Sequence, residues 1–375
     1  MTGTCFALVE VAPERRPGSG RAHPRAPRTR TTARSMQRLP LPRQATGALT
    51  LALMLLACES GPITSSAALP ASPGAPESSA EPVRFSRYPN PVYPGDFADP
   101  FVLRLDSVFY AYATNRGSSN VPTLRSLDLV SWLPVGDAMP RLPDWAASGR
   151  SLTWAPAVVE LDGRFVLFYT ARDRKSDRQC IGRAESASPS GPFVDGRSSP
   201  FVCQTDLGGS IDASVVRDSA GEPYLLWKND GNCCAKPVTL WSQRLSRDGT
   251  ALLGEPAALL NRDLLWEGPL IEAPTMWREA GSWHLLYSAN MWNTERYGVG
   301  YAVCESPVGP CRKIGQKPVL ASDGETAGPG GAEVFSDREG RTWVAYHGWS
   351  APVVGYSRGG VRSLRIDRVD VSEVF

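Results

Sequence analysis

Histidine is scarce in this chain, which has only three among 375 residues, and His284 and His347 are the two beyond the basic N-terminal stretch. So few imidazole groups argue against a metal site built from several histidines and against a Ser–His–Asp triad. The cysteines do not have the spacing of a structural zinc site either. Aspartate and glutamate are plentiful, so chemistry based on carboxyl groups is favoured.

The chain also lacks a large net charge, because 40 basic and 38 acidic residues give a formal charge of +2. This balance argues against a dedicated nucleic-acid binder. The arginines are concentrated in residues 1–45, which contain no lysine and only Glu10 and Glu14 as acids. From residue 58 onward the acidic residues outnumber the basic ones. We therefore expect a weakly acidic folded domain with no nucleic-acid partner.

A long hydrophobic run is missing as well. The uncharged stretch over residues 47–57 is too short to span a bilayer as a helix, which takes about 20 residues. Arg38 and Arg43 precede it, as in a secretory signal. The following Leu55-Leu56-Ala57-Cys58 resembles the bacterial lipobox, whose cysteine is lipidated. An ordinary signal peptide followed by an incidental cysteine is the alternative.

These features divide the N-terminal part of the chain. Residues 36–57 are interpreted as a lipoprotein signal peptide, and residues 58–84, rich in Ser, Ala and Pro, as a tether. Residues 1–35 are basic and have no apolar periodicity, so we interpret them as an extension upstream of a true start at Met36. A disordered basic arm is the alternative. The prediction is an exported, monomeric protein that faces the periplasm or the exterior and contacts the membrane through a lipid anchor only.

From residue 85 to residue 375 the chain has short apolar and aromatic runs divided by turn signals, and it shows no long helical periodicity. One unit recurs five times: a short strand, a tight turn and a second, aromatic strand. The units begin at Asp99, Ala155, Asp212, Glu272 and Gly331. A repeat of this size predicts an all-β fold, a five-bladed β-propeller. A β-sandwich with chance similarity between segments is the alternative.

Equivalent positions of the blades of a propeller form a ring around its axis. The repeat places three carboxylates, Asp99, Asp212 and Glu272, in this ring and leaves the small residues Ala155 and Gly331 in the other two blades. Like charges in a partly dry pocket raise at least one pKa, so that one group stays protonated. A protonated acid opposite an ionised base is what glycoside hydrolysis requires.

Aromatic side chains near this ring could stack on sugar faces. Trp154 and Trp292 are the candidates for substrate binding, together with the space beside Ala155, and Trp266 is a further aromatic residue in the region. Tryptophan side chains more often belong to the core, which is the alternative for each of them.

Several motifs resemble glycoside hydrolase family 43 between about Tyr88 and Asp370. They are Asp96-Phe-Ala-Asp-Pro-Phe101, Trp154-Ala-Pro156, Ser210-Ile-Asp-Ala-Ser214, Tyr224-Leu-Leu-Trp-Lys-Asn-Asp-Gly231, Ile271-Glu-Ala-Pro-Thr-Met276, Tyr297-Gly-Val-Gly-Tyr301 and Gly328-Pro-Gly330. The resemblance implies a five-bladed propeller that cleaves α-L-arabinofuranosyl, β-D-xylosyl or related linkages with inversion. It implies that Asp99 is the general base, that Asp212 orients the acid and tunes its pKa, and that Glu272 is the general acid. Glu267 is the local rival for the acid.

One position departs from the family pattern. Many members have a histidine after the Gly-Pro-Gly segment that helps to bind a central cation, and Gly331 stands there in this chain. The departure puts a structural calcium ion in the central channel in doubt, and no cofactor is expected to be required. His347, at the end of the last aromatic strand, could reach an ion or water in the channel, and an ordinary structural role is the alternative.

Six cysteines follow the lipidation candidate Cys58, as suits an oxidising compartment. We expect disulfides between Cys180 and Cys203 and between Cys304 and Cys311, because each pair brackets a turn segment. The adjacent Cys233 and Cys234 could form a strained vicinal bond, and two free thiols are the simpler expectation.

Two functions remain open at this point. The first is a lipid-anchored glycoside hydrolase that acts on oligo- or polysaccharides. The second is a catalytically degenerate propeller that binds glycans without cleaving them. The chain ends at Phe375, where members of the family often continue through a strand that closes the propeller. Residues 85–95 could supply this strand, and a longer chain is the alternative.

Overall fold

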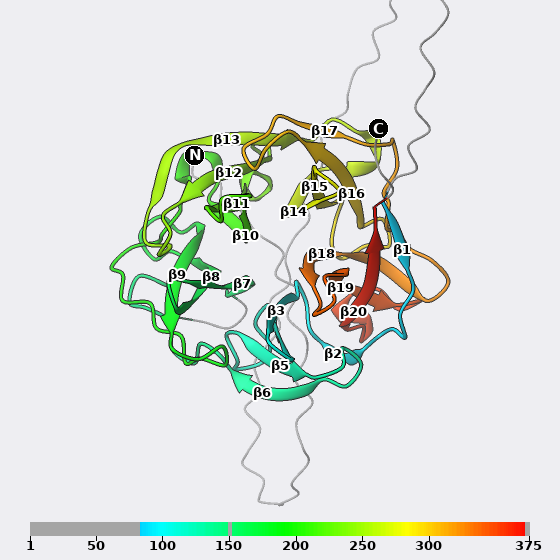
Figure 1. Ribbon diagram of the computed structural model, residues 1–375, viewed down its shortest axis with the longest axis horizontal. Coiled ribbons are helices and arrows are strands. Elements are labelled where there is room, and N and C mark those ends of the chain that lie inside the picture. Colours follow the sequence, from blue (N-terminus) through cyan, green and yellow to red (C-terminus); the bar gives the residue numbers. More distant parts are fainter. Residues whose placement is uncertain (1–82, 149–151, 372–375) are drawn as a thin grey trace, which may run out of the picture. The chain divides into compact units, whose positions relative to one another are not determined.

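The computed structural model describes residues 83–148 and 152–371, which form five antiparallel sheets around a central axis (Figure 1). This arrangement confirms the all-β, five-bladed propeller. The described part contains four short 3-10 helices and no α-helix, and none of its helices is long and apolar enough to cross a membrane. The basic extension, the signal segment, Cys58 and almost all of the tether lie outside the described residues.

The blades follow one another along the sequence, with the first strand of each nearest the axis (Figure 1). Blades one and two consist of β3 (Phe101–Leu105), β4 (Val108–Tyr112), β5 (Pro122–Ser126) and β6 (Leu133–Asp137), then β7 (Trp154–Leu161), β8 (Arg164–Arg172) and β9 (Gln179–Ser186). Blades three and four consist of β10 (Ser210–Arg217), β11 (Pro223–Asn229), β12 (Thr239–Leu245) and β13 (Leu252–Asn261), then β14 (Ile271–Glu279), β15 (Ser282–Ala289), β16 (Gly298–Cys304) and β17 (Cys311–Lys313). Blade five consists of β18 (Thr326–Ser336), β19 (Thr342–Ser350) and β20 (Arg362–Asp370), joined by β1 (Arg84–Ser86) and β2 (Tyr93–Asp96). The 3-10 helices are η1 (Thr205–Leu207), η2 (Gly231–Cys234), η3 (Leu265–Glu267) and η4 (Tyr356–Arg358).

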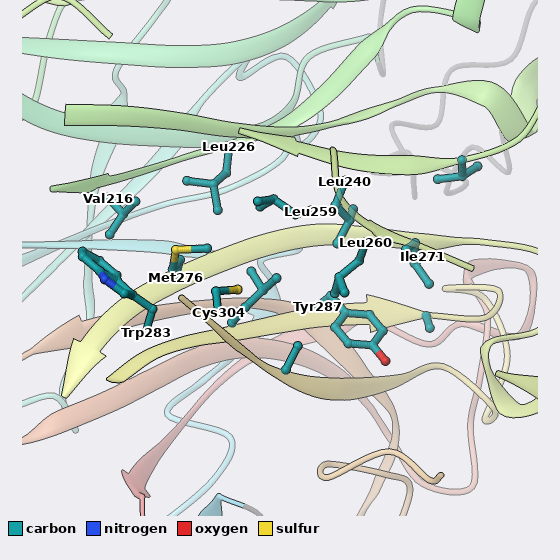
Figure 2. Packing of buried hydrophobic residues seen from close by; sticks show 14 of the residues in the cluster. Val216, Leu226, Leu240, Leu259, Leu260, Ile271, Met276, Trp283, Tyr287 and Cys304 are labelled. Carbon is teal, nitrogen blue, oxygen red and sulfur yellow. The ribbon is translucent and has the colours of Figure 1, made fainter. Parts of the chain in front are cut away.

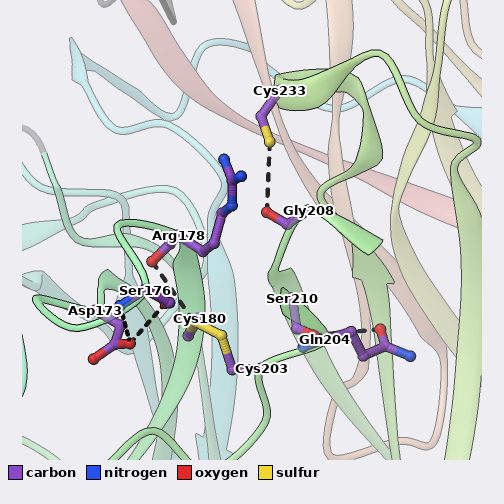
Figure 3. The surroundings of a disulfide bond; sticks show 9 residues. All are labelled: Asp173, Ser176, Arg178, Cys180, Cys203, Gln204, Gly208, Ser210 and Cys233. Atoms are coloured by element: carbon purple, nitrogen blue, oxygen red, sulfur yellow. Dashed lines mark hydrogen bonds between the residues drawn. A yellow bond between two sulfur atoms is a disulfide. The ribbon is translucent and has the colours of Figure 1, made fainter. Parts of the chain in front are cut away.

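Blade two has three strands, whereas blades one, three and four have four. The segment outside β9 makes only isolated bridges, from Glu185 to Val194 and from Ile181 to Val202. Pro192 and Pro200 interrupt this segment, and proline has no backbone N–H to donate to a ladder. The disulfide between Cys180 and Cys203 ties the end of the segment back to β9 (Figure 3).

The ring is closed by the N-terminal end of the described chain. Strand β1 pairs with residues 368–370 of β20, and β2 pairs with residues 363–364 of the same strand. The proposal that residues 85–95 supply the closing strand is thereby confirmed. The fold begins slightly earlier than residue 85, because Arg84 belongs to β1 and Val83 is buried in a core cluster.

Apolar side chains fill the space between adjacent blades. The cluster between blades three and four, for example, joins Leu226 of β11 and Leu260 of β13 to Met276 of β14 and to Leu285 and Tyr287 of β15 (Figure 2). Full burial of such a side chain contributes about 1.5–3 kcal/mol to the free energy of folding. These interfaces hold the inner strands at fixed positions around the axis.

The remaining cysteines are also bonded. Cys304 and Cys311 form the second expected disulfide. Cys233 and Cys234 form a vicinal disulfide within η2, so the expectation of two free thiols was wrong. The turn places the Cys233 side chain beside Gly208, whose carbonyl oxygen lies 3.5 Å from Cys233 Sγ (Figure 3).

Candidate active site

A break in regular pairing recurs at the start of the inner strands. The register shifts between Trp154 and Ala157, between Ile211 and Ser214, and between Glu272 and Thr275, with a similar shift after Gly330. In each blade one residue at this point has a positive φ: Asp99 (50°), Ala155 (41°), Asp212 (58°), Ala273 (49°) and Gly331 (58°). Residues other than glycine rarely adopt such angles, and those that do are concentrated at functional sites. These five residues are called the bulge ring below.

The bulge ring corrects one prediction by a single position. Ala273, and not Glu272, is the blade-four equivalent of Asp99 and Asp212. Glu272 is the last paired residue before the bulge, the place that Trp154 takes in blade two. The shared Ala-Pro dipeptide after Trp154 and after Glu272 was the sequence signal for this alignment. Two carboxylates therefore lie in the bulge ring, and the third lies one residue before it.

Side chains at the ends of the second strands of blades one, four and five link these blades to the next. The backbone N–H of Ala155 donates to Thr114 Oγ1 (3.0 Å), that of Gly331 to Ser288 Oγ (2.9 Å), and that of Asp99 to His347 Nδ1 (3.0 Å). The equivalent residues of blades two and three are Thr170 and Lys228. Thr170 Oγ1 is buried and has no hydrogen-bond partner within the described part of the chain.

Asp99 is the accessible carboxylate of the site, with 24% of its side chain exposed. The Thr114 hydroxyl donates to its Oδ2 (2.6 Å), and Nη1 of Arg362 lies 3.5 Å from its Oδ1. Arg362 is in turn held by the Tyr356 hydroxyl, which accepts a hydrogen bond from its Nε at 3.0 Å. The carboxylate is thus oriented by a hydroxyl on one side and a guanidinium on the other, while part of it remains open to a water molecule.

Asp212 and Glu272 lie in a drier environment. Burial and the negative charge of Glu272 raise the pKa of Asp212 to about 8, although Lys228 opposes the shift. Asp212 Oδ2 accepts the backbone N–H of Ala273, the residue after Glu272, at 3.0 Å. Glu272 is bound at both oxygens, by Lys228 Nζ (2.9 Å) and by the Tyr297 hydroxyl (2.8 Å). The pair formed by Asp212 and Glu272 therefore holds a proton near neutral pH, and the buried Lys228 lies beside it as a counter-charge.

The aromatic candidates have different environments. Trp292 stacks on Trp349 with ring centroids 6.3 Å apart, and the Arg362 guanidinium lies 4.6 Å from the Trp292 ring. Arg362 therefore contacts both the Trp292 ring and the Asp99 carboxyl group. Trp154 is half-buried at the blade-two position that corresponds to Glu272. Trp266 is partly buried and packs against the core cluster between blades three and four, so its contacts are structural.

Glu267, the rival for the acid, is engaged in structure. Its side chain is fully buried, and Lys313 Nζ lies 2.6 Å from its Oε1. The Tyr287 hydroxyl donates to the same oxygen, while the N–H groups of Asp263 and Leu264 donate to Oε2. A carboxylate with these partners has no free face for a substrate, which leaves Glu272 as the candidate acid.

His347 does not fit a directly bound calcium ion. Its Nδ1 accepts the Asp99 N–H, and burial together with the charge of Arg362 lowers its pKa well below the usual value. The neutral ring therefore has its proton on Nε2, which is buried without a hydrogen-bond partner among the described residues. A protonated nitrogen has no lone pair for a cation. Within residues 83–148 and 152–371, no group of three or more His, Cys, Asp or Glu side chains could hold a metal ion.

The glycine at 331 explains where the imidazole lies. A Cβ at this position would lie 2.7 Å from His347 Nδ1 and 2.8 Å from Asp99 Oδ1. His347 and a larger residue at 331 are therefore mutually exclusive in this geometry. The imidazole occupies the space beside Asp99 because residue 331 has no side chain.

Sequence reasoning missed Lys228, Tyr297, Thr114 and Arg362 as residues of the site. Lys228 gave a signal, since it is a charged residue within the apolar run of β11. Tyr297 begins one of the motifs named above, but the motif does not show its contact with Glu272. Arg362 gave no signal, because its contact with Asp99 depends on how blades five and one meet.

Comparisons with known proteins agree with this geometry. Residues 88–373 match the family model of glycosyl hydrolases family 43. The chain is 26% identical over 278 residues to a β-D-galactofuranosidase of Aspergillus niger, a match that covers 69% of this chain and 75% of that protein. A putative β-xylosidase of Xylanibacter ruminicola is 23% identical, over 70% of this chain and 46% of its own length.

Solved structures lead to the same family. A thermostable family-43 glycoside hydrolase has 30% sequence identity and a TM-score of 0.68, with 77% of this chain and 94% of that chain covered. An endo-1,4-β-xylanase from Bacteroides thetaiotaomicron has 27% identity and a TM-score of 0.62, with 79% and 97% covered. The family model spans most of the chain, and the described fold is the fold of these enzymes. The chain belongs to glycosyl hydrolases family 43 and is a glycoside hydrolase.

Proposed function

We propose that this hydrolase releases α-L-arabinofuranosyl or β-D-xylosyl groups from oligo- or polysaccharides with inversion of configuration. Asp99 takes a proton from a water molecule, whose oxygen forms a bond to the anomeric carbon. The bond from that carbon to the glycosidic oxygen breaks at the same time, and Glu272 gives a proton to this oxygen. Asp212 orients the acid and adjusts its proton affinity.

The observation that supports these roles is the contrast between the carboxyl groups. Asp99 is partly open to solvent and lies near the Arg362 guanidinium, so a water molecule can reach the carboxyl group proposed as the base. Asp212 is desolvated beside Glu272, and its pKa is raised to about 8, so the pair formed by these two groups retains the proton that Glu272 passes to the leaving group. Titratable groups that differ in this way divide into acid and base.

An activity screen tests the proposal. The purified protein should hydrolyse an aryl α-L-arabinofuranoside or an aryl β-D-xyloside, with branched arabinan and arabinoxylan as the polymer substrates. An aryl β-D-galactofuranoside is the third small substrate, because the Aspergillus niger relative carries that name. Proton NMR of the first product should show the inverted anomer. Glycan binding without turnover would instead favour the non-catalytic alternative.

Replacement of the acid and the base tests their roles. Glu272→Gln should lower kcat by about 10²–10⁴-fold, with larger losses on substrates whose leaving groups are poor, because these depend most on proton donation. Full activity in Asp99→Asn would overturn the assignment of the base. Glu267→Gln is not a suitable control, since it would remove the partner of buried Lys313.

We further propose that the protein is an exported monomer anchored through lipid on Cys58. The support is the apolar run over residues 47–57, which directly precedes this cysteine. Expression in a bacterium fed labelled palmitate should label the wild type and not Cys58→Ser. Equal labelling of both proteins would contradict the anchor.

A further inference from the structure

Lys228 is fully buried in the middle of the site and is not part of the roles assigned above. Its side chain is 0% exposed, and its Nζ lies 2.9 Å from Glu272 Oε2. Burial alone would lower the pKa of this amine, but the charges of Glu272, Asp230 and Asp212 outweigh burial and raise it. Lys228 is therefore a buried cation held by carboxylates, and it loses these partners only at a large cost.

The position of Lys228 in the fold lets its side chain connect blade three to blade four. Lys228 occupies the position that Thr114, Ser288 and His347 occupy in blades one, four and five. Those three residues accept hydrogen bonds from backbone N–H groups of the following blade. Lys228 also reaches the following blade, but it contacts a side chain, the carboxyl group of Glu272. In blade four the Ala273 N–H is bound by Asp212 instead.

The second oxygen of Glu272 is fixed from another side. The Tyr297 hydroxyl donates to Oε1 at 2.8 Å, and the Tyr297 ring stacks on His347 at a centroid distance of 5.8 Å. Glu272 therefore has one donor from blade three and one from the segment that precedes β16. With both oxygens bound, rotation of the carboxyl group is restricted, and its orientation toward the ring is set by these two donors.

We propose that Lys228 is a positioning residue that, together with Tyr297, fixes the Glu272 carboxyl group for proton donation. The inference rests on the proposed function, because it assigns Lys228 a role through the general acid. The Lys228 ammonium group also compensates one negative charge of the pair formed by Asp212 and Glu272. The pair then retains a single proton in the free enzyme, the one that a leaving group requires.

The charged and titratable groups around the pair are known. Asp230 follows β11 and interacts with Lys228 and Glu272, and Arg178 interacts with Asp230. Asp99 interacts with Asp212 and Tyr297 across the ring. None of these other groups forms a hydrogen bond with Glu272 among the described contacts. Lys228 is therefore the charged group whose removal should act most directly on Glu272.

The test compares Lys228→Met with Lys317→Met, which removes an exposed lysine. Lys228→Met should lower kcat by about 10-fold or more and change KM little. The loss should be larger on an alkyl glycoside than on a 4-nitrophenyl glycoside, and the alkaline limb of the pH–rate profile should move upward. Lys317→Met should match the wild type. A Lys228→Met enzyme with wild-type kcat and an unchanged alkaline limb would overturn the inference.

A second measurement does not depend on turnover. Glutamate labelled with carbon-13 at the carboxyl carbon allows NMR titration of Glu272, whose signal is assigned by its loss in Glu272→Gln. The titration midpoint should move upward in Lys228→Met and remain in place in Lys317→Met. Tyr297→Phe keeps the aromatic ring and removes one of the two donors to Glu272, so it should also move the titration midpoint upward. This variant replaces Lys228→Met in the experiment if Lys228→Met does not fold. An unmoved midpoint overturns the role of Lys228, whereas a wild type that cleaves no glycoside overturns the proposed function.

Discussion

At the scale of single residues, environment separates carboxyl groups of the same chemistry. Asp99 and Asp212 occupy equivalent positions of the bulge ring and have similar backbone angles. Thr114 and Arg362 surround the first, while burial and the charge of Glu272 dominate the second. The difference comes from the neighbouring blades and not from the residue type, so a motif alone cannot assign acid and base.

The raised pKa of Asp212 predicts an alkaline limit to activity. A group whose pKa is raised to about 8 is protonated below that pH and loses its proton above it. Because the pair of Asp212 and Glu272 must provide a proton, kcat should fall as the pH rises through about 8. A pH–rate profile of kcat measures this limb. Constant kcat between pH 7 and pH 10 would contradict it.

Gly331 makes a second prediction at this scale. In Gly331→Ala the new methyl group would lie within 3 Å of both His347 and Asp99, so the base should be displaced and kcat should fall by about 10-fold or more. Gly340→Ala is the matched control. Gly340 also has a positive φ, and a Cβ there would meet no atom within 4 Å. Similar losses of kcat in the two variants would show that backbone strain, and not the collision, is responsible.

At the scale of strands, the sequence predicted the fold more completely than it predicted the contacts within the site. The units found in the sequence are the inner strands and their partners, because apolar alternation and turn signals are local. The three-stranded blade two was not predicted, since whether residues 194–202 pair depends on their prolines and on the sheet beside them. Contacts such as Lys228 with Glu272 join residues 44 positions apart, so only the packing of blades could reveal them.

The closing strand provides a test at the level of an element. Val83 is 5% exposed and packs with Val369 in one cluster. Val83→Asp should therefore lower the free energy of unfolding by about 2–4 kcal/mol, because it buries a carboxylate without a partner. Ser86→Ala, which removes only an exposed hydrogen bond to Asp370, should change it by less than about 0.5 kcal/mol. Urea unfolding measures both, and equal stability in the two variants would mean that the packing of Val83, directly before β1, does not help to hold the ring closed.

At the scale of the whole molecule, a second layer of residues lies below the bulge ring. Ser214, Thr275 and Glu333 each follow the bulge residue of their blade by two positions. The Ser214 hydroxyl donates to Glu333 at 3.0 Å. Burial raises the pKa of Glu333 to about 8, although hydrogen bonds from Ser214 and Thr275 oppose the shift. A half-buried carboxyl group that has no ion pair among the described residues thus lies where three blades meet.

Glu333 should make the propeller less stable in alkaline solution. Its pKa is raised from 4.5 to about 8, so the folded state binds the proton more tightly than the unfolded state does between these pH values. The free energy of unfolding therefore falls as the pH rises through this window, and the contribution of this group is lost above about pH 8. In Glu333→Gln the decline between pH 5 and pH 8.5 should be smaller, as measured by urea unfolding at both pH values. An unchanged decline would assign it to other groups.

The pairing of β1 with β20 also affects how the protein is made. The hydrogen bond from Ser86 to Asp370 joins residues 284 positions apart, so the first described strand must wait for the last before the ring can close. During synthesis, four blades can form while blade five lacks β20 and its edge strands remain unpaired. Exposed strand edges favour association with other chains. The nascent protein therefore has its greatest need of a chaperone just before its final strand emerges.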